Sequence, residues 1–188
     1  VKHVILHKIT PTNMDIIERK RYLDKLLKLR GNGQVKIITG IRRCGKSFLL
    51  NKIFCNHLLQ EGVASSHIIM LDLDDDLNAR YRNPIELSEH LRSKIKEDDD
   101  RHYILIDEIQ RVKPVPNPYL SDEKIGFVDV LNGLRNLPNV DVYVTGSNSK
   151  MLSGDIATEF RGRGDISPLA PLTFDEFYGG FPDEKRYA

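Results

Sequence analysis

The sequence has no tryptophan, only two cysteines and no long apolar run. Cys44 and Cys55 form no C-x-x-C pair and are too few for a disulfide framework, so a reducing, cytoplasmic environment is expected. No apolar stretch approaches the roughly 18 to 20 residues that cross a bilayer. The apolar start, residues 1–13, is too short and too interrupted by His and Lys for a signal peptide. The sequence therefore predicts neither a membrane span nor a secreted protein.

The sequence also has no clear excess of positive or negative residues. The chain has 28 Lys and Arg against 27 Asp and Glu, for a net charge of +1. Proteins that grip nucleic acid over a broad surface usually carry a clear basic excess, so the charge does not indicate such binding. A local basic patch stays open. The short acidic runs at 72–76 and 97–100 are expected to be solvated loops beside strands.

What the chain does have is a regular alternation of strand and helix patterns. Short apolar, β-branched segments predict strands at 35–39, 67–73, 102–106 and 141–145, with a fifth at 165–169 limited by Pro168 to an edge. Helical spacing of apolar residues predicts helices over 15–30, from 49 to Gly62, 84–96 and 127–137. This alternation predicts an α/β fold with a parallel sheet covered by helices on both faces. With 188 residues and 40% hydrophobic composition, we expect a single domain over 1–188, in which the proline-rich segment 113–126 is a loop insertion.

Two helix starts carry specific capping signals. Asn83 can cap a helix whose first position, Pro84, needs no backbone N–H donor. Thr173 and Glu176 have the spacing of a capping box and predict a last helix after Thr173.

The segment GIRRCGKS, residues 40–47, matches G-x-x-x-x-G-K-[ST] at every fixed position. Gly40 and Gly45 let the backbone N–H groups turn inward and approach a phosphate closely. Lys46 is expected to contact the β- and γ-phosphates, and Ser47 to bind Mg²⁺ through its hydroxyl. The motif follows a predicted strand and opens a predicted helix, which adds its N-terminal partial charge. The candidate cofactor-binding residues are Gly40, Ile41, Arg42, Arg43, Cys44, Gly45, Lys46, Ser47 and Phe48.

The residues at the variable positions of this motif have interpretations that involve no catalytic role. Arg42 and Arg43 are expected to be exposed to solvent, with contact to a phosphate or a partner as the alternative. Cys44 is not expected to be a nucleophile because no histidine lies near it in sequence.

A phosphate loop binds nucleotide, but hydrolysis also needs a metal carboxylate and a group that orders water. Asp107 ends the apolar run 102–106 and would lie at the tip of the third strand, where ligands of such sheets bind. It is the candidate second metal ligand, together with Ser47. Glu108, one residue on, is the candidate general base.

Further candidates follow the fourth strand. Asn148, with Ser147 second, could reach the γ-phosphate or the attacking water. Arg161 and Arg163 are candidates for the arginine that stabilises the charge developing in phosphoryl transfer, either within the chain or toward a neighbouring subunit.

Taken in order, the segments IERKRYLDKL, ITGIRRCGKS, ILIDEIQ, VTGSNS and GRGDISPLAPLTFDEF resemble a prokaryotic family of P-loop ATPases in the AAA+ superfamily. The resemblance covers nearly all of 15–180. It implies ATP and Mg²⁺ as cofactors and favours Arg163, directly after Gly162, as the family arginine. It also implies a C-terminal domain of nuclease-like fold and uncertain function, so this chain is expected to be the N-terminal part of a longer protein. The usual lid with a second sensor arginine is not visible in the sequence.

The first hypothesis is therefore an ATPase with a three-layer α/β/α P-loop fold and strand order 5-1-4-3-2, whose nucleotide state controls an attached domain or partner. Self-association would act through Arg161 or Arg163. Adenine is favoured because no guanine-reading N-K-x-D motif is present. The alternatives are a nucleotide-dependent switch without turnover and a helicase-like motor, which the missing basic excess disfavours. A small-molecule kinase is disfavoured because nothing resembles a lid for an acceptor substrate.

Overall fold

The computed structural model describes residues 16–147, 160 and 162–179. Arg19–Pro171 form one compact unit, and a second unit, Val1–Glu18 with Leu172–Ala188, contains the short helix α8 (Phe174–Gly179). The expected single domain over 1–188 stays a prediction. In the described part of the chain, no helix is both long enough and apolar enough to cross a membrane.

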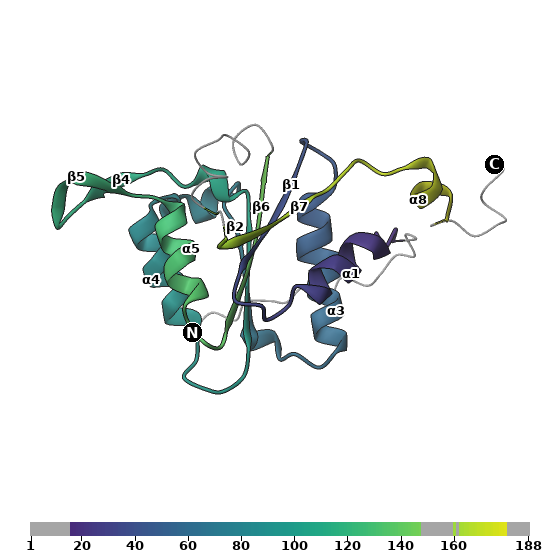
Figure 1. Ribbon diagram of the computed structural model, residues 1–188, viewed down its shortest axis with the longest axis horizontal. Coiled ribbons are helices and arrows are strands. Elements are labelled where there is room, and N and C mark those ends of the chain that lie inside the picture. The colour runs from purple at the N-terminus through teal and green to yellow at the C-terminus, as the bar shows by residue number, and fades with distance from the viewer. Residues whose placement is uncertain (1–15, 148–159, 161, 180–188) are drawn as a thin grey trace. The chain divides into compact units, whose positions relative to one another are not determined.

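A parallel five-stranded sheet forms the centre of the larger unit (Figure 1). Its strands are β1 (Val35–Gly40), β2 (Ile68–Asp72), β3 (His102–Asp107), β6 (Val140–Ser147) and β7 (Gly164–Pro168). The spatial order is β2-β3-β6-β1-β7. Numbered along the chain and read from the β7 edge, this order is 5-1-4-3-2, which confirms the sequence-based prediction.

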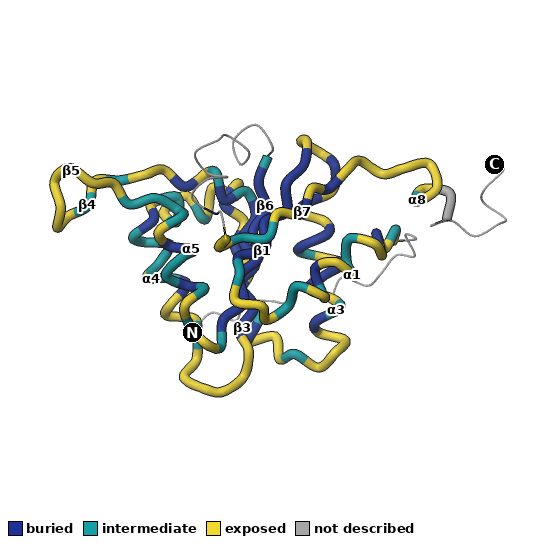
Figure 2. Tube along the Cα trace, in the orientation of Figure 1, coloured by how far each residue is buried: buried dark blue, intermediate teal, exposed yellow. Residues whose placement is uncertain are grey.

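Burial explains the composition of these strands. Every residue of β1 and β3 is buried, because both lie inside the sheet with helices on each side. The two edge strands are partly exposed, and β7 ends at Pro168, whose missing N–H is tolerated at an edge. Figure 2 shows the buried strands between the more exposed helices and loops.

Helices cover both faces and give the expected three layers (Figure 1). One face is covered by α4 (Pro84–Lys94) and α5 (Phe127–Arg135). The other is covered by α1 (Lys20–Lys28) and by a continuous helix over Lys46–Gln60. That helix consists of α2 (Lys46–Phe48), a π-helical segment (Leu49–Phe54) and α3 (Cys55–Gln60). Each face has its own cluster of buried apolar side chains.

The predicted capping signals are confirmed. The backbone N–H of Ile85 donates to Asn83 Oδ1 at 2.9 Å, and Pro84 follows as the first residue of α4. At α8, Thr173 N donates to Glu176 Oε2 at 3.0 Å and Glu176 N donates to Thr173 Oγ1 at 3.2 Å.

The proline-rich segment 113–126, predicted as a loop insertion, contains two strands. Residues 115–125 form an antiparallel hairpin of β4 (Val115–Asn117) and β5 (Leu120–Ile125), separate from the main sheet. Asn117 Oδ1 accepts from Tyr119 N at 3.0 Å and closes the turn. The prolines obscured this hairpin, because an isolated two-stranded ribbon leaves room for residues without an N–H donor.

One buried ion pair joins β1 to β6. Lys36 Nζ pairs with Asp141 Oδ1, and both side chains are almost fully buried. Asp141 Oδ2 accepts from Tyr143 Oη at 3.0 Å and from Gly31 N at 2.9 Å. Burial, together with the Asp141 charge, raises the pKa of Tyr143 well above its ordinary value, so its hydroxyl remains a donor. The carboxylate thus has three donors, the condition for tolerating a buried charge.

Candidate functional site

The parallel strands bring the phosphate loop and the Asp107–Glu108 pair to one edge of the sheet. Gly40, at the end of β1, pairs in register with Ser147 at the end of β6. Asp107, at the end of β3, pairs with Asp72 at the end of β2. This carboxyl edge, formed by the C-terminal ends of β1, β6, β3 and β2, is where ligands of open parallel sheets bind.

The loop after β1 has a backbone that its glycines make possible. A Cβ on Gly40 would lie 2.6 Å from Leu169 O and 2.6 Å from Cys44 Sγ, so no side chain fits there. Arg43 and Gly45 both have positive φ, at 64° and 94°. The loop therefore turns sharply and enters the helix at Lys46.

The side chains of this loop divide into two groups. Cys44 is buried in the core beneath the loop, which leaves its backbone and not its thiol for ligand contact. The outward-facing residues of the loop are exposed, as expected for Arg42 and Arg43; they are Ile41, Arg42, Arg43, Ser47 and Phe48.

Lys46 is buried at the start of the helix, with only 4% of its surface exposed. Its Nζ donates to Ile41 O at 3.0 Å and to Gly40 O at 3.3 Å. The ammonium group is thereby held over the concave side of the loop. A compact positive charge at a helix N-terminus, next to a glycine loop with positive-φ residues, suits a polyphosphate.

The Asp107 carboxylate lies two strands away, on the same face of the sheet as the phosphate loop. Side chains alternate along a strand, and Tyr103 and Leu105 pack in the cluster under the Lys46–Gln60 helix. Asp107, two residues further on, shares this face and is buried. A carboxylate oxygen at this position suits Mg²⁺, which takes few protein carboxylates.

Glu108 begins the turn that leaves β3. Its φ is 55° and its ψ is 48°, in the left-handed region that non-glycine residues seldom adopt. The backbone N–H of Glu108 donates to Thr145 Oγ1 at 3.0 Å, and the same hydroxyl donates to Asp107 Oδ1. The Glu108 carboxylate accepts from Gln110 Nε2.

Arg163 lies at the opposite edge of the sheet. Its carbonyl accepts from Val35 N at 3.1 Å, at the beginning of β1, while Gly40 ends that strand. At roughly 3.3 Å per residue, the two ends are about 16 Å apart. Arg163 is exposed and does not lie beside the phosphate loop of its own chain. Asn148 and Arg161, also predicted as site residues, lie outside the described residues.

Sequence reasoning missed Arg19, which is buried beneath the phosphate loop. Its Nη1 donates to Cys44 O at 3.2 Å and its Nη2 to Ala170 O at 2.8 Å, and its guanidinium lies 4.6 Å from the centre of the Tyr22 ring. It therefore joins the loop to the segment after β7. No local signal marks it, because Arg19 stands among other basic residues at the start of α1.

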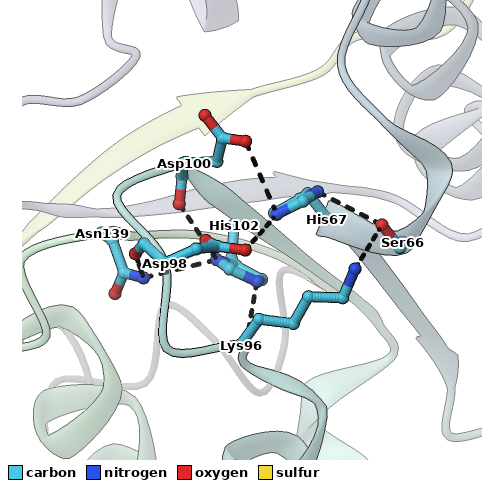
Figure 3. Close-up of polar contacts among 7 residues, drawn as sticks. All are labelled: Ser66, His67, Lys96, Asp98, Asp100, His102 and Asn139. Atoms are coloured by element: carbon cyan, nitrogen blue, oxygen red, sulfur yellow. Dashed lines mark hydrogen bonds and ion pairs between the residues drawn. The ribbon is translucent and has the colours of Figure 1, made fainter.

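A second group of titratable side chains lies at the amino edge of the sheet, where β2 and β3 begin (Figure 3). His67 Nε2 contacts Asp98 Oδ2 at 2.9 Å, and the rings of His67 and His102 are 4.4 Å apart. The ligand atoms of His67, Asp98 and His102 lie within 4.8 Å of one another, close enough for a metal ion. The acidic run 97–100 is thus tied to the sheet and is more than a solvated loop.

The hydrogen bonds of His102 argue against metal binding in this arrangement. Lys96 N donates to His102 Nε2 at 3.0 Å, so Nε2 carries no proton, and Nδ1 lies 3.1 Å from Asp100 O, where it donates. A metal on Nδ1 would need the proton on Nε2, directly facing another N–H donor. Burial lowers the pKa of His102, and the hydrogen bond from His67 lowers the pKa of Asp98. Above pH 7 the group therefore holds a neutral His102 beside an ionised Asp98, and it acts as a structural clasp between the 97–100 segment and the sheet.

Changing Lys46 to Ala is expected to weaken binding of a nucleoside triphosphate about 10- to 100-fold, because one charge-assisted contact contributes roughly 1.5–3 kcal/mol. Titration with a fluorescent triphosphate analogue measures the affinity. Lys52→Ala, an exposed lysine on the same helix, is the matched control. Equal affinity in the Lys46 and Lys52 variants would remove the phosphate-loop assignment.

The free energy of unfolding is expected to fall as the pH drops from 7.5 to 5.5. The lowered pKa of His102 means that the folded state binds its proton less tightly, so this stability is complete above about pH 6.5 and lost below it. His102→Gln keeps an acceptor for Lys96 N but does not titrate, so its urea denaturation should depend less on pH. Burial also lowers the pKa of His90, so part of the pH dependence of the unfolding free energy remains in this variant. If that pH dependence is the same in His102→Gln as in the unmodified chain, His102 does not stabilise the fold in this way.

Comparison with known proteins agrees with this geometry. A model of the AAA domain family matches residues 32–178. The chain is 33% identical over 162 residues to an uncharacterized protein of Haemophilus influenzae, covering 86% of this chain and 37% of that protein. It is 27% identical over 194 residues to an uncharacterized protein of Methanocaldococcus jannaschii, covering 100% of this chain and 38% of that protein. The chain thus spans under two fifths of the length of both curated relatives.

Solved structures support the same fold. The structure of C. elegans PCH-2 matches with a TM-score of 0.55 and 13% identity, over 88% of this chain and 42% of that one. A DNA polymerase III gamma subunit-related protein of Thermotoga maritima matches with a TM-score of 0.50 and 13% identity, over 84% and 48%. At this identity the likeness shows the fold alone. With the family match over most of its length, a glycine loop at the carboxyl edge and the strand order 5-1-4-3-2, the chain belongs to the AAA domain family of the AAA+ P-loop ATPases.

Proposed function

We propose that this domain binds Mg-ATP at the carboxyl edge of the sheet and hydrolyses the bond between the β- and γ-phosphates. The observation that carries the proposal is the adjacency of two carboxylates with different environments. Asp107 is buried and hydrogen-bonded, whereas the Glu108 side chain is half-exposed at the turn. One suits a fixed metal ligand and the other suits a group that exchanges a proton with water.

The phosphate loop would supply binding and orientation. Backbone N–H groups between Gly40 and Lys46 would surround the β-phosphate, and Lys46 would turn from the loop carbonyls to the β- and γ-phosphates. Ser47 and Asp107 are the residues that would hold Mg²⁺, which when bound neutralises charge on the phosphate oxygens. Fixing these groups before reaction is the main contribution expected of the protein.

Glu108 would act on the attacking water. As the water oxygen bonds to the γ-phosphorus, the bond from that phosphorus to the bridging oxygen breaks, and the carboxylate accepts the water proton. The products are ADP and inorganic phosphate. The Gln110 amide donates to one oxygen of this carboxylate, Oε2, and the other oxygen would take the proton.

Nucleotide state would then control an attached domain or partner. This part rests on the short span of the chain within its curated relatives, most of whose length lies outside the match. A cytoplasmic location, supported by the two free buried cysteines, belongs to the same proposal.

Changing Glu108 to Gln is expected to lower steady-state phosphate release from Mg-ATP by at least about 100-fold, since a positioned acid–base group contributes 10²–10⁴-fold. ATP affinity should change little, because Gln keeps the size of the side chain. Phosphate release and triphosphate binding are measured on the same preparations, with Glu123→Gln on the exposed strand β5 as control.

Each result assigns a function. Full turnover in Glu108→Gln moves the general base elsewhere. Tight Mg-ATP binding with no turnover in the unmodified chain favours a nucleotide-dependent switch. Turnover that rises with single-stranded nucleic acid and falls with salt favours a helicase-like motor.

We further propose that Arg163 acts on the nucleotide of a neighbouring copy. Its place at the amino edge supports this, because about 16 Å of β1 separates it from its own phosphate loop. An exposed arginine there is free to reach a second chain, where it would stabilise charge on the γ-phosphate.

Mixing two inactive variants tests this proposal. Arg163→Ala keeps an intact phosphate loop and Lys46→Ala keeps the arginine, so each alone should release phosphate at least about tenfold more slowly. Mixed together they should recover part of the activity, and turnover per chain of the unmodified protein should rise with concentration. Lys124→Ala, on the exposed strand β5, is the control. Turnover independent of both Arg163 and concentration would overturn the proposal.

A further inference from the structure

Thr145 stands out among the residues that the sequence analysis left unassigned. It lies near the end of β6, the strand between β1 and β3, and it is fully buried. Along β6, Asp141 and Tyr143 precede it on the same face of the strand, which faces the Lys46–Gln60 helix. The Thr145 hydroxyl therefore points to the layer that carries the phosphate loop.

The hydroxyl donates one hydrogen bond and accepts another, both with residues at the end of β3. It donates its hydrogen to Asp107 Oδ1 and accepts the backbone N–H of Glu108 at 3.0 Å. A single oxygen thus touches the candidate metal ligand and the backbone of the candidate base. Asp107 ends β3 and Glu108 directly follows it, so the contact depends on β6 lying beside β3.

The contact with Glu108 has a conformational consequence. A non-glycine residue at φ 55° costs of order 1 kcal/mol and persists only when its surroundings hold it. The N–H of Glu108 has left the strand ladder and would lack a partner without Thr145. The left-handed turn also leads directly into the 3₁₀ helix Ile109–Arg111, whose first residue, Ile109, is fully buried. The direction of the Glu108 side chain is thus determined by the hydroxyl at one end and by buried Ile109 at the other.

We infer that Thr145 is a positioning residue that holds the Asp107 carboxylate and the Glu108 backbone in their working arrangement through one hydroxyl. The inference rests on the proposed ATP hydrolysis and adds a residue to it. Thr145 contacts neither nucleotide nor water in this role. It acts through the two carboxylate residues, so its loss should affect turnover and metal binding more than nucleotide binding.

Thr145→Val tests the inference, because valine has nearly the same shape and lacks only the hydroxyl. The expected result is a fall in kcat of about 10- to 100-fold, the effect of a small misplacement of catalytic groups. KM for ATP should stay within about twofold, since the Thr145 hydroxyl bonds to Asp107 and Glu108 at the end of β3. Thr145→Ser, which keeps the hydroxyl, should restore most of kcat. Ser167→Ala, which removes another buried hydroxyl, one without a hydrogen-bond partner among the described residues, is the control and should not change kcat.

A second measurement does not depend on turnover. Electron paramagnetic resonance of Mn²⁺ measures metal affinity in the presence of a non-hydrolysable ATP analogue. Thr145→Val should bind Mn²⁺ several-fold more weakly than the unmodified chain, and Thr145→Ser should not. Wild-type kcat and Mn²⁺ affinity in Thr145→Val would overturn the inference. So would a loss of turnover, ATP binding and thermal stability together that serine fails to rescue, because that pattern means a structural role alone.

Different results would overturn the proposed ATP hydrolysis and the proposed role of Thr145. If the unmodified chain releases no phosphate, the proposed hydrolysis fails, and the Mn²⁺ comparison still decides whether Thr145 positions Asp107. If the unmodified chain hydrolyses ATP and Thr145→Val does so equally well, hydrolysis stands and the role of Thr145 falls.

Discussion

The parallel pairing of β1, β6 and β3 is the constraint on which the site depends. It places the ends of three strands at one edge, so the loop after β1 and the Asp107–Glu108 pair at the end of β3 share this edge although about sixty residues separate them in the sequence. The strand between them, β6, comes later in the chain than both. The site is therefore complete only when β6 lies between β1 and β3.

Buried polar contacts fix the register of β6 near its beginning and near its end. Near its beginning, Asp141 pairs with Lys36 on β1 and accepts from Tyr143 and Gly31. Near its end, Thr145 bonds to Asp107 and Glu108 on β3. Because unpaired buried polar groups are costly, a shift of β6 by one residue would leave both sets unsatisfied. The same contacts that specify the register thus also set the geometry of the carboxylates.

Much of the fold could be predicted from the sequence because its signals are local. The strand runs, the capping residues Asn83 and Thr173, and the glycine loop each act within a few residues. Strand order followed from the resemblance and is confirmed by the pairing of β6 with both β1 and β3. The hairpin at 115–125 was not predicted, since prolines and exposed polar residues conceal its pairing.

The roles of the other residues near the site could not be predicted from the residues around them in the sequence. Thr145 occurs in the run DVYVT, where a threonine indicates only a strand. Its role depends on which strand lies beside it. Arg19 is one of several basic residues around the start of α1, and only the folded chain shows that its guanidinium reaches Cys44 O. Arg163 could be named from the sequence, but its distance from Gly40 comes from the register of β7 with β1.

Amide hydrogen exchange, with and without saturating Mg²⁺ and a non-hydrolysable ATP analogue, tests the central claim most directly. The claim is that the carboxyl edge holds the nucleotide. We predict slower exchange of the backbone amides within residues 40–48 and at Glu108, with little change around His67 and His102 at the amino edge. Unchanged exchange over 40–48 at saturating nucleotide, or protection confined to the amino edge, would contradict the account.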